Sequence, residues 1–264
     1  MHQCDVPSAG AAASWRRLSL IARHTLGEAL HLRLTMLLGF AGAALVGGAL
    51  GLREYNFGRA ELKFISDFGL GALGLFGTLL AALVTAQLFF REIETRSAYW
   101  VLTRPVRRWE YLGGKFAGIA ALLALYTASL GLLLAGLLAW RGAQLGVEPL
   151  DGRLLLCACA LQWFKITLVA AMTLLVCSYA GSALFASCTG LLLALVAHLR
   201  PFAVGDHLAW LRVWPNLALF DAESLLAADQ ALTGTWLLGL VLYWAAYLCL
   251  FGALASYVFH DREL

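Results

Sequence analysis

Six long apolar runs limit what this chain can fold into. They cover residues 34–52, 68–90, 116–140, 154–177, 181–199 and 236–259. A helix needs about 20 apolar residues to cross the roughly 30 Å hydrocarbon core of a bilayer. Hydrophobic residues make up 61% of the chain and charged residues 13%, whereas soluble domains have about 45–50% and 25%. The runs therefore predict six transmembrane segments.

Each of these segments is expected to be an α-helix. In lipid, every backbone N–H and C=O must find its partner within the protein, which leaves only helices and closed barrels. The runs are continuous and lack the alternation of apolar and polar residues that marks barrel strands. The predicted fold class is therefore an all-α integral membrane protein, with a six-helix domain over residues 34–259.

The distribution of basic residues orients these helices. Six spans place both termini on one side, and Lys and Arg favour cytoplasmic segments. With the termini inside, cytoplasmic segments carry eleven Lys and Arg residues and the outer segments seven. We therefore expect residues 1–33 and the tail 260–264 in the cytoplasm. Arginine outnumbers lysine sixteen to three, which is typical of GC-rich bacterial genomes, so a bacterial inner membrane is the expected location.

An amphipathic segment precedes the first span. In residues 15–33, Trp15, Leu18, Ala22 and Leu26 recur at helical spacing, and Arg and His residues occupy the other side. Such a helix can lie at the headgroup level of a membrane, with Trp15 as an interfacial anchor. A helix packed against a partner is the alternative.

The sequence offers little support for catalysis or cofactor binding. The net charge of +3 and the lack of a basic, aromatic stripe argue against nucleic acid. The six cysteines fall mostly inside apolar runs, and no His or carboxylate has matching metal-ligand spacing. "GLGALG" at 69–74 follows no strand, so its glycines are expected to let helices pack closely instead of binding a nucleotide. We predict no catalytic residue, no metal site and no bound cofactor in this chain.

One polar pair interrupts the fourth apolar run. Gln162 and Lys165 are a possible intramembrane polar site, because an ionisable residue inside a span costs about 2.5–3.5 kcal/mol on insertion scales and usually serves a purpose. Two interpretations remain. Lys165 belongs to a pathway or pairs two helices, or it extends its ammonium to the outer interface.

Charge is concentrated in "REIETRSAYWVLTRPVRRWEYLGGK", residues 91–115, which holds nine of the 35 charged residues. Pro105 divides it, because the residue before a proline avoids helical backbone angles. In the first part, Glu92 can pair with Arg96 and Arg91 with Glu94 on one helix. Charges of both signs suit docking to a protein better than attraction to lipid. We predict a cytosolic helix whose docking residues are Arg91, Glu92, Glu94, Arg96 and Arg104.

The second part of this stretch opens the third span. Basic and aromatic side chains are typical of a membrane-interface belt, and we expect Arg107, Arg108, Trp109 and Lys115 to be anchors. An alternative for the whole stretch is a topology anchor with no docking role.

Three sequence elements together resemble a known family. "EIETR" at 92–96, "LTRPVRRWEY" at 102–111 and "GK" at 114–115 look like the cytoplasmic signature of ABC-2-type ABC transporter permeases. "VWPNLALFDAESLL" at 213–226 is similar to the family's outer element between spans five and six, and "FHDREL" at 259–264 to its cytosolic tail.

The resemblance implies a function. It implies a non-catalytic permease that forms a dimer with a second permease copy and binds two separate ATPase subunits, which hold ATP and Mg. The N-terminal helix would be the interfacial connecting helix, and residues 91–104 the coupling helix. We therefore predict an exporter subunit. The alternative is a membrane scaffold that recruits soluble partners through residues 91–115 without transport. An intramembrane enzyme or a secondary transporter would need polar clusters or inverted repeats that we do not find.

Overall fold

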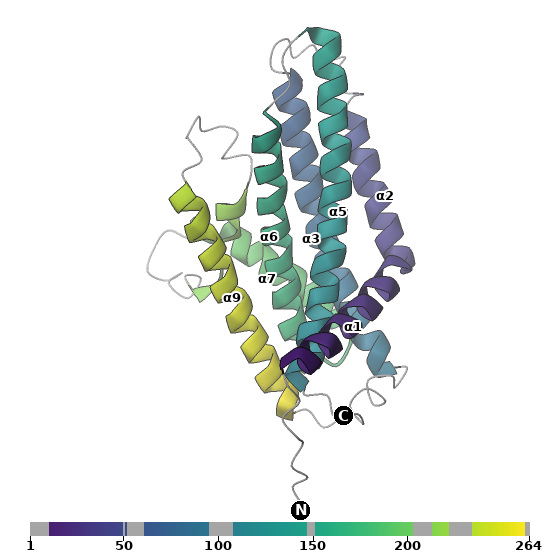
Figure 1. The fold of residues 1–264 in the computed structure, drawn as a ribbon, viewed down its shortest axis with the longest axis vertical. Coiled ribbons are helices and arrows are strands. Elements are labelled where there is room, and N and C mark those ends of the chain that lie inside the picture. The colour runs from purple at the N-terminus through teal and green to yellow at the C-terminus, as the bar shows by residue number, and fades with distance from the viewer. Residues whose placement is uncertain are drawn as a thin grey trace, which may run out of the picture.

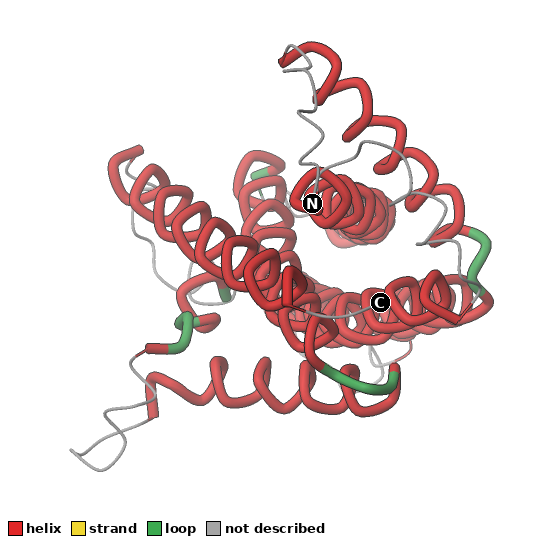
Figure 2. Tube along the Cα trace, turned by 90° about the horizontal axis from the view of Figure 1, so that it is seen from below, coloured by secondary structure: helices red, strands yellow, loops and turns green. Residues whose placement is uncertain are grey.

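The structure is a computed structural model that describes residues 11–49, 51, 61–94, 108–146, 151–202, 213–221 and 234–261. Nearly all of the described residues are helical, and they contain no strand (Figure 2). The all-α membrane fold predicted from the apolar runs is therefore confirmed.

Seven α-helices and two short 3-10 turns make up the described part of the chain. They are α1 (Ala11–Leu30), α2 (Arg33–Gly48), α3 (Glu61–Glu94), α5 (Arg108–Leu145), α6 (Gly152–Tyr179), α7 (Ala183–Leu199), η3 (Arg200–Phe202), η5 (Leu217–Phe220) and α9 (Gly234–Asp261). Side-chain caps fix two of the starts. The Asp151 carboxylate accepts from the Arg153 N–H at the start of α6, and Ser182 caps α7.

Five to six spans fit the helices observed. Helices α3, α5, α6, α7 and α9 are each long and apolar enough to cross a membrane. The first predicted span, residues 34–52, corresponds to α2, which has 16 residues and is about 24 Å long at 1.5 Å per residue. It counts as a sixth span only together with α1, and the two helices meet at a bend of 67°.

Helices α3 and α5 extend well beyond the apolar runs that predicted them. They have 34 and 38 residues, so they are about 51 and 57 Å long, and α5 reaches the upper end of the molecule in Figure 1. At that end the Arg141 Nε lies 2.7 Å from the Glu61 carboxylate. The pair formed by α3 and α5 thus extends beyond the roughly 30 Å hydrocarbon core of a bilayer, and polar side chains hold this extension together.

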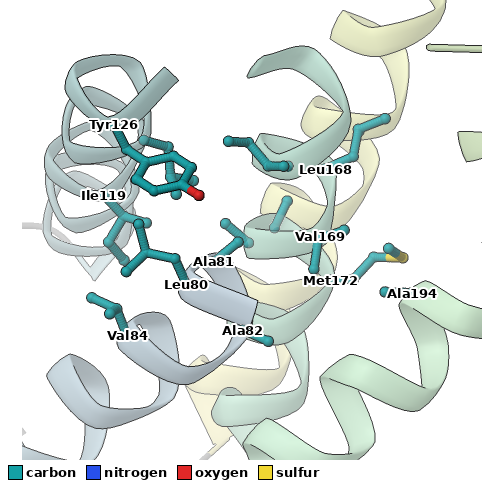
Figure 3. Close-up of a cluster of buried hydrophobic side chains, with 14 of the residues drawn as sticks. Leu80, Ala81, Ala82, Val84, Ile119, Tyr126, Leu168, Val169, Met172 and Ala194 are labelled. Atoms are coloured by element: carbon teal, nitrogen blue, oxygen red, sulfur yellow. The ribbon is translucent and has the colours of Figure 1, made fainter. Parts of the chain in front are cut away.

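Small and branched apolar residues build the core where four helices meet. Figure 3 shows Leu80 and Ala81 of α3 facing Ile119 and Tyr126 of α5, with residues of α6 and α7 beside them. The alanines of α3 are fully buried, which lets α3 and α6 pack closely. Large apolar side chains remain on the outer faces, including Leu132 and Leu184 at 73% and 75% exposure, as expected for surfaces that contact lipid.

Candidate functional site

Helix α1 lies across the lower part of α5 (Figure 1), and two glycines of α5 make this contact possible. A Cβ atom on Gly118 would lie 2.7 Å from both the Ala22 carbonyl oxygen and the Thr25 Cβ. One on Gly114 would lie 2.8 Å from the Ile21 Cβ. Real Cβ atoms do not approach that closely, so only glycine at these positions lets the two backbones meet. The N-terminal helix therefore packs on its own chain.

Polar contacts hold α1 in place at both of its ends. Near its start, the Ser14 hydroxyl donates to the Glu110 carboxylate at 2.6 Å, and the Arg17 Nε lies 3.5 Å from the same carboxylate. Near its end, the Glu28 carboxylate lies 3.4 Å from the Arg91 Nε of α3. Glu110 is completely buried, and these contacts stabilise its carboxylate there. Helix α1 is thereby tied to α5 and to α3.

A buried ion pair joins the last turns of α3 to the first turns of α5. The Lys115 Nζ lies 2.8 Å from a Glu92 carboxylate oxygen and donates to the Leu88 carbonyl at 2.8 Å. The Tyr111 hydroxyl donates a short hydrogen bond to the same carboxylate oxygen. The Phe89 and Tyr111 rings lie 5.2 and 5.5 Å from the Nζ, within range of cation–π attraction. Lys115 has no exposed surface, so this pair is part of the bundle interior.

The structure corrects the division drawn at Pro105. Lys115 was grouped with the membrane anchors and Glu92 with the docking residues, but the two neutralise each other inside the bundle. Arg91 pairs with Glu28 of α1. The rule for pairs three or four residues apart sees partners only within one helix. It therefore missed the pair of Glu92 and Lys115, which lie on two different helices and 23 positions apart in the sequence.

Several other predicted residues keep exposed positions. Glu94 is exposed at the end of α3, and Trp15 and Trp109 are 71% and 49% exposed. Arg96, Arg104 and Arg107 lie outside the described residues, as does the side chain of Arg108, with which α5 begins. The docking and anchor roles of these residues stay predictions.

Sequence reasoning missed Glu28 and Glu110, which tie α1 to the other helices. Glu28 is the only acidic residue in the amphipathic segment 15–33, and that isolation was the available signal. Glu110 stands among aromatic and basic residues, and nothing in that pattern indicated a buried carboxylate. No group of three or more metal-ligating side chains occurs among the described residues.

A second polar group lies where α6, α7 and the end of η5 meet. The Lys165 Nζ of α6 is 2.5 Å from the Asp221 carboxylate, which follows η5. The His198 Nδ1 lies 3.8 Å from the other oxygen of Asp221. Lys165 is therefore paired with a carboxylate of a neighbouring element, and both interpretations of Lys165 stay predictions. Asp221 belongs to the 213–226 element, which sequence analysis identified without connecting it to Lys165.

A family of known proteins matches the sequence over most of these helices. The sequence model described as "ABC-2 family transporter protein" matches residues 18–212, which covers most of α1 and all of α2, α3, α5, α6 and α7. No curated protein matches the chain. Permeases of this family are multi-pass membrane subunits, generally non-catalytic, that work with an ATPase subunit. Because the match covers most of its length, the chain belongs to the ABC-2 family of transporter proteins and is a permease-type membrane subunit.

Proposed function

We propose that this permease is the membrane subunit of an ATP-driven exporter, in which two permease copies work with two ATPase subunits at the cytoplasmic side. The ATPase subunits would bind ATP and Mg, and this chain would convert their motion into a change of its helices. The observation that carries the proposal is the buried Lys115–Glu92 pair, which fastens together the two helix ends that flank residues 95–107.

The linked helix ends give a route for mechanical coupling. A partner that moves the segment between α3 and α5 acts on two helix ends that are already joined, so both helices must shift together. Helix α1 must follow, because its Glu28 is paired to Arg91 and its backbone is packed against Gly114 and Gly118. Packed interfaces of this kind switch by rigid-body movement. Both helices run the length of the bundle, so a shift at the lower end reaches the upper end.

Docking of a partner is best tested at Glu94, because the surroundings of its side chain differ from those of Glu92. Glu94 is exposed, whereas Glu92 is 9% exposed and pairs with Lys115. Reversing Glu92 would damage the fold and confuse the result. Reversing Glu94 changes only a surface charge beside residues 95–107.

We expect Glu94→Lys to reduce by about tenfold the amount of an ATPase, encoded beside this chain, that co-purifies with it. Like charges brought together at an interface oppose binding, and a factor of ten corresponds to about 1.4 kcal/mol. Lys63→Glu is the matched control, since Lys63 is an exposed charge at the other end of α3. It should leave the recovered ATPase unchanged.

Two outcomes would contradict the proposal in different ways. If the ATPase binds neither the wild-type chain nor either variant, the chain does not act as its permease. If the ATPase binds but the reconstituted complex shows no ATP-dependent change in the permease, the scaffold alternative is correct. Limited proteolysis of the complex in vesicles, with and without ATP, measures that change without knowledge of the substrate.

A further inference from the structure

A cavity lined by Gln162 and Lys165 occurs in the described part of the chain. It has a volume of about 400 Å³ and lies between α3, α6, α7 and η5. Small-molecule pockets typically measure about 300–1,000 Å³. Its walls carry the leucines Leu75, Leu79, Leu191, Leu195 and Leu217, and its polar lining includes Gln162, Lys165, His198 and Asp221. The recess thus has an apolar part and a polar part.

Gln162 is a polar group that the fold leaves unsatisfied. Its side chain lines the cavity and is 3% exposed, and its Oε1 atom has no hydrogen-bond partner among the described residues. A Cβ on Gly74 would lie 3.1 Å from that oxygen, so the glycine makes room for the amide, as expected for the 69–74 glycines. Buried amides without partners are rare and call for an explanation. The terminal torsion of glutamine turns easily, so the amide can meet a ligand in the cavity.

The charges of the cavity select a neutral or zwitterionic ligand. Lys165 and Asp221 cancel each other, so a ligand with both an anionic and an ammonium group can use both partners without breaking their 2.5 Å contact. Lys165 has three N–H donors and uses one on Asp221. An anionic group can accept from the other two, while an ammonium group can donate to Asp221 and Gln162. A choline head lacks the N–H groups that these acceptors need.

The rim of the cavity faces the surroundings of the bundle. Leu75 of α3 and Leu195 of α7 line it and are 59% and 54% exposed. Exposed leucines on membrane helices contact lipid chains, so a ligand can enter from the bilayer with its chain along the leucines. The volume of about 400 Å³ accommodates the head and the first part of one acyl chain, and the rest of the chain extends past the rim.

We propose that the cavity formed by Gln162, Lys165, Asp221 and the surrounding leucines binds a single-chain amphiphile with a zwitterionic, ammonium-bearing head. Lysophosphatidylethanolamine has this chemistry. Binding requires neither ATP nor a partner subunit, so the proposal stands or fails separately from the transport function.

The test is native mass spectrometry of the purified full-length chain with lauroyl lysophosphatidylethanolamine, lysophosphatidylcholine and lysophosphatidylglycerol. We expect the ethanolamine lipid to bind about tenfold more tightly than the glycerol lipid. Its ammonium group makes about one additional hydrogen bond to a charged group, and such a bond corresponds to about this factor in affinity. The choline lipid should fall between them. Gln162→Leu should weaken ethanolamine binding to the choline level. Gln87→Leu is the control, because Gln87 is exposed on α3 away from this cavity.

A second pair of variants keeps the test decisive if Gln162→Leu fails to fold. Leu75→Trp fills the rim of the cavity from an exposed position and should reduce binding of all three lipids by about tenfold or more. Leu132→Trp places the same bulk on an exposed face of α5 and should have no effect. Equal binding of the three lipids to wild type and Leu75→Trp would show adsorption to the outer surface and overturn the proposal. Tightest binding of the glycerol lipid, or no saturable binding, would overturn it as well.

Discussion

Replacing Lys115 with Met is expected to lower the free energy of unfolding by about 3–5 kcal/mol. The substitution preserves the length and apolar contacts of the side chain but leaves the Glu92 carboxylate buried without its cation. Removing one partner of a buried ion pair typically costs that much, because the remaining charge is uncompensated. The loss is measured by denaturant unfolding in mixed micelles, followed by circular dichroism.

The double variant Lys115→Met with Glu92→Leu serves as the control. Replacing both members of a buried pair by apolar residues is often neutral or stabilising, so the double variant should recover most of the lost stability. A single variant that loses less than about 1 kcal/mol, the range of an exposed ion pair, would show that the pair is accessible to water. A double variant as unstable as the single would show that Lys115 acts through its bond to the Leu88 carbonyl and not through Glu92.

Gly118→Ala is expected to destabilise the attachment of α1 by about 1–3 kcal/mol, the usual effect of adding a methyl group where packing leaves no space. The added Cβ would meet the Ala22 carbonyl oxygen at 2.7 Å, and a backbone atom cannot move aside without moving the helix. The unfolding experiment used for Lys115 measures the effect.

Gly136→Ala is the matched control on the same helix. A Cβ on Gly136 would have no neighbour within 4 Å, so the change should be neutral or stabilising by about 0.5–1 kcal/mol, since alanine favours helices over glycine. If both variants behave alike, the effect at Gly118 is one of helix propensity and α1 is not held by close packing.

The fold class could be predicted from the sequence because the hydropathy of each apolar run indicates a membrane helix independently of the rest of the chain. A run such as 116–140 must be a lipid-embedded helix whatever surrounds it, and α5 confirms that helix. The limits of the helices were less predictable. Residues 61–67 and 141–145 are too polar to be counted as membrane-embedded, but they continue α3 and α5, and the Glu61–Arg141 pair links the two extensions. Hydropathy cannot detect a helix stabilised by its neighbour outside the lipid.

Only those features of the candidate site that depend on nearby residues in the sequence could be predicted. The charge of residues 91–115 lies at the end of the bundle where α3 ends and α5 begins, and Glu94 and Trp109 are exposed there. The pairing of Glu92 with Lys115, and of Lys165 with Asp221, depends on which helices become neighbours. That information is distributed over the whole core. Gly114 and Gly118 are an example, because the need for glycine at these positions is apparent only once α1 is known to lie against them.

The Lys115–Glu92 contact also has a consequence for the entropy of partner binding. It closes the chain segment between positions 92 and 115 into a loop during folding. Bringing together the ends of a segment of this length costs on the order of 3 kcal/mol in chain entropy. A partner that docks between these positions meets ends that are already fixed, so this part of the ordering cost does not reduce its affinity. The buried Lys115–Glu92 contact would thereby contribute to the affinity of any partner that docks at residues 95–107.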